Sequence, residues 1–217
     1  MEETKLIPIR SVNDNQQQII NDILKLHNRG NSIDLDCTYS KGIFYKNGVV
    51  TEPTYKTDLT PVVEGCIESS STDLPFEPET MQCVMFDPPF VIAGKTYKDS
   101  KEGSSRIAKR FSAYVNWDEL KDHWRDTLTE LHRIVKPKGI VIMKLQNTIS
   151  SGKQHMSHYM IMDHAIKTGF YPKDEFVLLS KSKMTSFGGR WKNQVHAMKH
   201  HSYFMVFEKR PCRVNYD

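Results

Sequence analysis

A short apolar strand that stops at two consecutive prolines constrains the fold of this chain more than any other feature. Residues 81–86 are apolar except for Gln82, and the sequence Asp-Pro-Pro-Phe follows at once at 87–90. An apolar run of this length is typical of a strand buried on both faces of a parallel sheet. Because proline has a fixed φ and no backbone N–H, we expect this central strand to end abruptly at residue 87.

Helix and strand patterns alternate along most of the chain. Apolar residues recur at three- and four-residue steps over 117–135, which predicts an amphipathic helix that ends before Gly139. We expect further helices at 14–29 and 156–167, the second ended by Gly169, and further strands at 33–36, 55–58, 65–68, 140–143, 175–179 and 202–207. Because no helix separates the last two strands, they can form an antiparallel pair. The pattern predicts an α/β sheet with helices on both faces.

The length suits a single domain over 1–217 with one continuous core. We expect an N-terminal helical segment at 1–30, a long loop at 91–115 after the tetrad, and a basic insertion at 181–201 between the last two strands.

Composition excludes several other classes of protein. No apolar stretch is long enough to cross a bilayer, and the charged N-terminus lacks a signal peptide, so we expect a cytoplasmic protein. The four cysteines have no C-x-x-C spacing, so neither a metal site nor a redox motif is predicted. The net charge of +4 permits a polyanionic partner without requiring one.

The tetrad suits one particular piece of chemistry. Pro88 and Pro89 make a rigid turn, so the Asp87 carboxylate and a proline carbonyl can both accept hydrogen bonds from one NH₂ group. Phe90 supplies a flat face for stacking. An aromatic amine is a poor nucleophile, and two fixed acceptors stabilise the positive charge that develops on its nitrogen during methyl transfer. Asp87, Pro88, Pro89 and Phe90 are therefore the predicted catalytic residues.

With this tetrad the chain resembles the amino-methyltransferases of nucleic acids, whose signature is Asp/Asn/Ser-Pro-Pro-Tyr/Phe/Trp. The resemblance covers roughly residues 33–208, including the segments 74–76 and 131–139, and 36–46 is similar to small phage and prophage DNA methylase-like proteins. It implies a Rossmann-like class I methyltransferase sheet with helices on both faces and an antiparallel final strand. It also implies S-adenosylmethionine as cofactor and a site-specific enzyme, with adenine N6 in DNA as the favoured target.

The resemblance further implies a set of cofactor-binding residues. The loop after the first strand would hold the methionine part of the cofactor, Asp58 would bind the ribose hydroxyls, and the segment 70–74 would lie by the adenine. The usual Gly-rich first motif is missing, and Ser70 stands where the family often has Asp. The residues implied are Asp36, Thr38, Tyr39, Ser40, Gly42, Asp58, Ser70, Ser71 and Leu74.

Two basic stretches predict contacts with nucleic acid. No Asp or Glu occurs from Phe176 to Phe207, where lysines and arginines alternate with aromatic residues, and the loop after the tetrad is also basic. Such mixtures neutralise phosphates and stack on bases. The predicted nucleic-acid-binding residues are Lys95, Arg106, Lys109, Arg110, Lys181, Lys183, Arg190, Trp191, Lys192 and Lys199.

Several alternatives stay open at this point. Asp in the tetrad favours adenine N6, whereas Phe90 leaves room for RNA targets. Other candidates are a protein glutamine methyltransferase and an inactive nucleic-acid-binding module with the same fold. The chain offers only loops for reading a target sequence, so short sites, a partner or a homodimer would follow.

Overall fold

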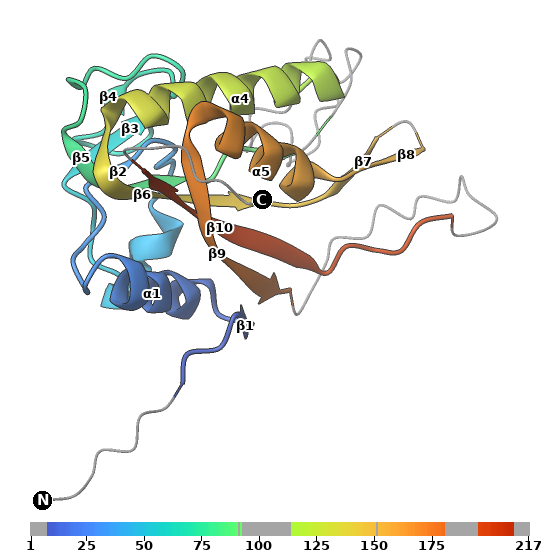
Figure 1. Cartoon of the computed structure of the whole chain (residues 1–217), viewed down its shortest axis with the longest axis horizontal. Coiled ribbons are helices and arrows are strands. Elements are labelled where there is room, and N and C mark those ends of the chain that lie inside the picture. The colour runs from blue at the N-terminus through green and yellow to red at the C-terminus, as the bar shows by residue number, and fades with distance from the viewer. Residues whose placement is uncertain (1–7, 91, 93–113, 151, 181–194, 211–217) are drawn as a thin grey trace, which may run out of the picture.

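Parallel strands surround one antiparallel strand in the central sheet (Figure 1). The computed structural model describes residues 8–90, 92, 114–150, 152–180 and 195–210. Within these residues the sheet has eight strands in the order β1-β9-β10-β6-β5-β2-β3-β4. The strands are β1 (Val12–Asn13), β2 (Leu35–Asp36), β3 (Tyr55–Asp58), β4 (Ile67–Glu68), β5 (Met81–Phe86), β6 (Val135–Leu145), β9 (Phe170–Leu179) and β10 (His201–Lys209).

The direction of β10 decides the fold class. β10 runs antiparallel to both of its neighbours, β6 and β9, whereas β2, β3, β4, β5 and β6 pair in parallel. The antiparallel final strand and its pairing with β9 are as expected above, and the structure adds that this strand lies between β9 and β6. The structure therefore confirms the predicted Rossmann-like class I methyltransferase sheet.

Helices cover both faces of the sheet, as predicted (Figure 1). α4 (Trp117–Ile134) and α5 (Ser157–Thr168) pack on one face, and α1 (Gln16–His27) lies on the other with the 3-10 segment η1 (Ile43–Gly48). Residues next to the helices define where they begin and end. The Asn15 side chain accepts hydrogen bonds from the first backbone N–H groups of α1, and Gly169 ends α5 in the left-handed region at φ 109°.

Two hydrophobic clusters fill the space on either side of the sheet. The cluster under α4 and α5 contains the fully buried Phe86 and Trp124. The cluster under α1 contains Phe44, Met85 and Phe204. Alternate residues of β5 thus point to opposite clusters, which explains why this strand is apolar throughout.

Some element boundaries differ from the prediction. The segment Lys136-Pro137-Lys138-Gly139, expected to end the helix before a strand at 140–143, lies inside β6, where Lys138 has φ 68° and the pairing with β5 is irregular. A Cβ on Gly139 would lie 2.9 Å from the backbone oxygen of Gln82, so the glycine permits a close approach of two strands.

The beginning of β9 was also predicted too late. β9 starts at Phe170 rather than residue 175, because its first half is only partly buried and so lacks an apolar signal. A hairpin of β7 (Thr148–Ser150) and β8 (Lys153–His155) was not predicted.

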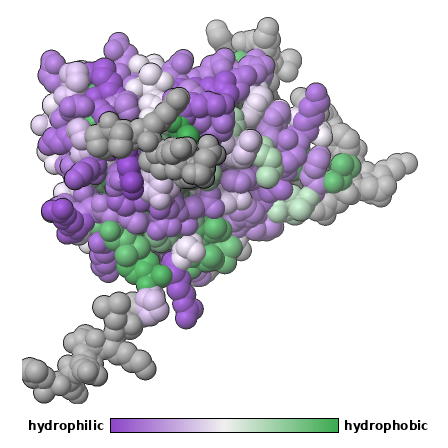
Figure 2. Space-filling model, in the orientation of Figure 1, coloured by the Kyte–Doolittle hydropathy of each residue, from purple (hydrophilic) through white to green (hydrophobic). Residues whose placement is uncertain are grey.

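Exposed hydrophobic residues gather beside α1 and β1. Ile9, Val12 and Leu179 are exposed and line one surface hollow there. Figure 2 shows hydrophobic colour at this lower end of the molecule, whereas the rest of the visible face is mostly hydrophilic. None of the helices in the described part of the chain is both long enough and apolar enough to span a membrane.

Candidate functional site

Three carboxylates meet at one edge of the sheet. Asp36 and Asp58 are the last residues of β2 and β3, and Asp87 directly follows β5. Since these parallel strands are neighbours, their carboxyl ends lie at the same edge, where open α/β sheets bind ligands. The structure thus brings together the predicted catalytic aspartate and two of the predicted cofactor-binding residues.

The tetrad is held by the loop after β2. The Asp87 backbone N–H donates to Thr38 Oγ1 at 2.7 Å, which fixes the start of the turn. Pro88 is buried, Pro89 is half-buried, and Phe90 packs against the cluster under α4. The turn is therefore fixed on both sides, by a hydrogen bond and by packing.

The two carboxylate oxygens of Asp87 differ in their surroundings. Oδ2 lies 3.7 Å from Lys144 Nζ, whereas Oδ1 is buried and has no hydrogen-bond partner among the described residues. Burial raises the pKa of Asp87 above its ordinary value, and the nearby Lys144 ammonium acts in the opposite direction. A buried acceptor without a partner costs stability, and a ligand that donates a hydrogen bond to Oδ1 would offset this cost.

The other aspartate next to the tetrad is more strongly perturbed. Asp36 is buried and accepts hydrogen bonds from Thr38 N at 2.9 Å and from Tyr45 Oη at 2.7 Å. Burial is the largest cause that raises the pKa of Asp36 to about 7, and the negative charges of Asp87 and Asp58 add to it. Thr38 thus bonds to both Asp36 and Asp87.

The single glycine of this loop is required by a buried tyrosine. Tyr39 is buried, its ring stacks on Tyr45 with centroids 5.6 Å apart, and its hydroxyl donates to Glu52 at 2.6 Å. Gly42 has φ 61°, and a Cβ there would lie 2.3 Å from Tyr39 Oη. The Tyr39 ring therefore fills the inside of the loop, and only glycine fits at 42.

Asp58, the last residue of β3, is hydrogen-bonded to the loop that follows β2. Its Oδ2 accepts from Ser40 N at 2.8 Å, and its Oδ1 accepts from Thr60 N at 2.9 Å. Each carboxylate oxygen has two acceptor sites, so a further donor such as a hydroxyl can still bind.

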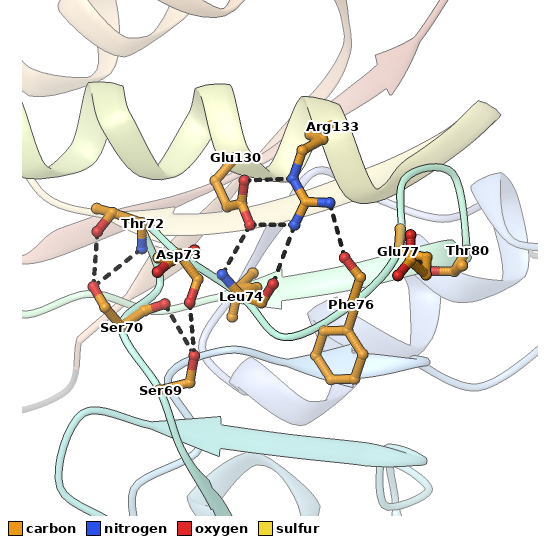
Figure 3. A network of polar contacts seen from close by, with 10 residues as sticks. All are labelled: Ser69, Ser70, Thr72, Asp73, Leu74, Phe76, Glu77, Thr80, Glu130 and Arg133. Atoms are coloured by element: carbon orange, nitrogen blue, oxygen red, sulfur yellow. Dashed lines mark hydrogen bonds and ion pairs between the residues drawn. The ribbon is translucent and has the colours of Figure 1, made fainter.

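The loop predicted to lie by the cofactor adenine is clamped onto α4 (Figure 3). Glu130 Oε1 accepts from Leu74 N at 2.8 Å, and the Arg133 guanidinium donates to the carbonyls of Leu74 and Phe76. Leu74 itself is buried in the core. The backbone of this loop is held in place independently of any ligand.

The two serines of the same loop point to different partners. Ser70 Oγ lies 2.8 Å from Thr72 Oγ1 in its own turn. Ser71 Oγ is buried and lies 2.9 Å from both His123 Nε2 and Thr127 Oγ1 on α4. The Ser71 side chain thus serves the contact with α4, and the role of this loop in binding a cofactor stays a prediction.

Of the predicted nucleic-acid contacts, only Lys199 is described. It is half-buried, just before β10 begins at the carboxyl edge, and its carbonyl accepts from Gln146 Nε2 at 3.4 Å. The others lie outside the described residues: Lys95, Arg106, Lys109, Arg110, Lys181, Lys183, Arg190, Trp191 and Lys192.

Sequence reasoning missed Lys144 and Gln16. Lys144 is the charged residue within the otherwise apolar second half of β6. Gln16, the first residue of α1, accepts a hydrogen bond from Lys144 Nζ at 3.2 Å. A charge inside an apolar strand was the only available signal, and it did not identify the partner. In the described part of the chain no group of three or more His, Cys, Asp or Glu side chains could hold a metal ion.

Comparison with known proteins gives structural neighbours only. No protein-family model matches this chain, and no curated protein matches it. The PvuII cytosine-N4-specific DNA methyltransferase is 18% identical with a TM-score of 0.48, over 65% of this chain and 47% of that one. This chain therefore spans about half the length of that enzyme.

Two further structures match over most of both chains. The N-methyltransferase NodS from Bradyrhizobium japonicum WM9 is 7% identical with a TM-score of 0.49, covering 90% of this chain and 96% of that one. A 1,6-didemethyltoxoflavin-N1-methyltransferase from Burkholderia thailandensis, solved with S-adenosylhomocysteine, is 11% identical with a TM-score of 0.49, covering 91% and 79%. These likenesses concern the fold, which the strand order establishes directly.

Proposed function

We propose that this chain transfers a methyl group from S-adenosylmethionine to an exocyclic amine of a nucleic-acid base, adenine N6 in DNA. The single observation that carries the proposal is the buried Oδ1 of Asp87 at the carboxyl edge of the sheet, which has no hydrogen-bond partner among the residues that the structure describes. An amine N–H is the kind of donor that such an acceptor requires. The rigid turn of Pro88 and Pro89 holds the acceptor in place before the substrate arrives.

The residues at this edge suit S-adenosylmethionine. The cofactor has two ribose hydroxyls and an ammonium, which are hydrogen-bond donors, and Asp58 retains free acceptor sites at the end of β3. The loop from Asp36 to Gly42, fixed by Asp58 and Thr38, would hold the methionine part. The cofactor would supply an electrophilic methyl group on a sulfonium.

The protein's own part is to orient the amine and stabilise its charge. The Asp87 carboxylate accepts one N–H and a proline carbonyl accepts the other, so the nitrogen lone pair is directed away from both acceptors. As the new C–N bond forms and the methyl–sulfur bond of the sulfonium breaks, positive charge develops on the nitrogen, and the fixed carboxylate stabilises it. S-adenosylhomocysteine would be the leaving group, and the methylated nitrogen would then lose one proton to solvent. Phe90, packed on the core, offers its ring to the base.

The choice of nucleic acid rests on charge and on the resemblance. The chain from Phe176 to Phe207 contains no acidic residue, and the sequence after the tetrad, at 91–115, is rich in lysine and arginine. A base within duplex DNA would have to be flipped out to reach the site. The similarity of residues 36–46 to phage and prophage methylase-like proteins supports a phage-type modification enzyme.

Methyl transfer from labelled S-adenosylmethionine to unmethylated DNA, followed by nucleoside mass analysis, tests the proposal. We expect N6-methyladenine, and Asp87→Ala should abolish its formation without changing the circular dichroism spectrum. N4-methylcytosine would redirect the proposal to another base. Label that appears only in RNA or in a glutamine-containing peptide would refute DNA as the substrate.

One observation favours a second candidate, a nucleic-acid-binding module without catalysis. Tyr39 fills the loop that would hold the cofactor. Isothermal calorimetry with S-adenosylmethionine separates the two functions. Binding supports the enzyme, whereas retained DNA binding without cofactor binding supports the module.

A further inference from the structure

Lys144 lies beside Asp87 because of the register of the sheet. β5 and β6 are parallel, and Phe86 pairs with Met143, so the next residues along the two strands are Asp87 and Lys144. Both side chains point to the α1 side of the sheet, as do Met85 and Ile142 two positions earlier. A lysine at this place is therefore an unavoidable neighbour of the tetrad's carboxylate.

The Lys144 ammonium is held by groups other than Asp87. Its side chain is only 14% exposed, and Nζ donates to Gln16 Oε1 at 3.2 Å. Nζ also lies 5.0 Å from the ring centroid of Phe44 and 5.7 Å from that of Phe204. These contacts fix the cation near Asp87 while the 3.7 Å separation leaves no direct hydrogen bond between them.

The groups around Asp87 come from several elements: charged residues on β6, β2 and β3, an uncharged glutamine on α1 and a tyrosine on η1. Lys144 faces it from β6, Asp36 lies nearby on β2 with Asp58 beyond it, and Gln16 on α1 reaches it only through Lys144. Tyr45 on η1 bonds Asp36 rather than Asp87. Lys144 is therefore the only described cation that forms an ion pair with Asp87.

We infer that Lys144 is a positioning residue of the proposed methyl-transfer site, which supplies the counter-charge of Asp87 while leaving Asp87 Oδ1 open to the substrate amine. The inference rests on the proposed function. The Asp87–Lys144 pair itself has no net charge, so it suits contact with a neutral amine, such as that of a base. Lys144 acts through Asp87 and contacts no substrate atom.

The test measures the titration of Asp87 and the pH dependence of methyl transfer in the same variants. In Lys144→Met, carbon-13 NMR of labelled aspartate carboxyls should show the Asp87 midpoint displaced to higher pH than in the wild type. The acid limb of kcat/KM for transfer from S-adenosylmethionine to unmethylated DNA should move with it. Activity should fall about tenfold per pH unit of displacement on the acid limb, and recover at high pH. Lys144→Arg should keep both midpoints.

Lys173→Met is the matched control, since Lys173 pairs with Glu208 at the opposite edge of the same sheet. It should leave the Asp87 titration unchanged. Lys144→Gln, which keeps a polar group, serves as a second variant if Lys144→Met does not fold. An unshifted Asp87 midpoint in the folded variant would overturn the role of Lys144 whether or not the wild type is active. Absence of methyl transfer by the wild type would instead overturn the proposed function.

Discussion

Glu208 and Asp87 belong to the same sheet and each lies near a lysine, but the pKa of Glu208 is lowered and that of Asp87 is raised. Glu208, near the end of β10, accepts from Lys173 and also from Arg210 Nε at 2.8 Å. Burial acts to raise the pKa of Glu208, but these two cations outweigh it and the pKa is lowered. At the other edge, burial wins over the single cation, and the pKa of Asp87 is raised.

The difference is the one expected if Glu208 is a structural group and Asp87 has the proposed functional role. Glu208 has two cationic partners within the fold, so its charge is stabilised when the chain folds. Asp87 has one lysine at ion-pair distance and a buried oxygen without a partner among the described residues. The fold therefore keeps Asp87 at a cost in stability, which a ligand that donates to Oδ1 would offset.

The sharpest way to break this comparison is to remove each carboxylate in turn. Asp87→Ala should lower methyl transfer by about 10²–10³-fold or more, as expected for losing a fixed electrostatic partner of the transition state. Glu208→Ala should leave transfer intact but lower the free energy of unfolding by about 1–3 kcal/mol, since Lys173 and Arg210 lose their partner. Initial rates and urea denaturation measure the two effects.

The reverse result would be decisive against this distinction. If Asp87→Ala lowers the free energy of unfolding as much as Glu208→Ala does, and the variant retains methyl transfer, Asp87 is a structural residue and the site lies elsewhere.

A second prediction concerns Asp36, whose pKa is raised from 3.8 to about 7, chiefly by burial. Between these two pH values the folded protein retains a proton that the unfolded chain has released. The free energy of unfolding should therefore fall as pH rises through this window, by an amount on the order of 4 kcal/mol. Glu208 has a lowered pKa and contributes with the opposite sign: its stabilisation is lost as pH falls.

Asp36→Asn isolates this effect, because asparagine keeps the shape and can still pair with Thr38 N and Tyr45 Oη. Its stability relative to the wild type should increase from about pH 4 to pH 7 and then level off. Urea denaturation at several pH values gives both curves. Parallel curves for wild type and variant would show that Asp36 titrates normally.

Two threonines allow the same comparison with uncharged groups. Thr38 Oγ1 accepts from Asp87 N at 2.7 Å, whereas Thr57 Oγ1 is buried without a partner among the described residues. Thr38→Val should lower transfer about tenfold, because the N–H that positions the tetrad loses its acceptor. Thr57→Val should leave activity unchanged and the thermal midpoint equal or higher. Equal losses of activity in the two variants would mean that the hydrogen bond from Asp87 N to Thr38 is not what supports methyl transfer.

The sequence predicts local features of this molecule better than contacts between distant residues. The end of β5 was predictable because an apolar run and two prolines stand next to each other. Gly169 ends α5 as expected for the same local reason. The Lys144–Asp87 and Lys173–Glu208 pairs were not predictable, because each depends on strand register. The early start of β9 was missed since a half-buried strand carries little periodicity.

The smallest expected effect concerns nucleic-acid binding at the two edges of the sheet. Lys199 precedes β10 at the carboxyl edge, and the exposed Lys136 is the second residue of β6, at the opposite edge. Lys199→Gln should weaken DNA binding a few-fold, and the slope of log K against log salt concentration should become shallower by about 1, as for one lost phosphate contact. Lys136→Gln makes the same chemical change and should alter neither quantity. Fluorescence anisotropy across a salt series measures both, and equal effects at the two positions would mean that DNA binds without preference for the edge where Asp87 lies.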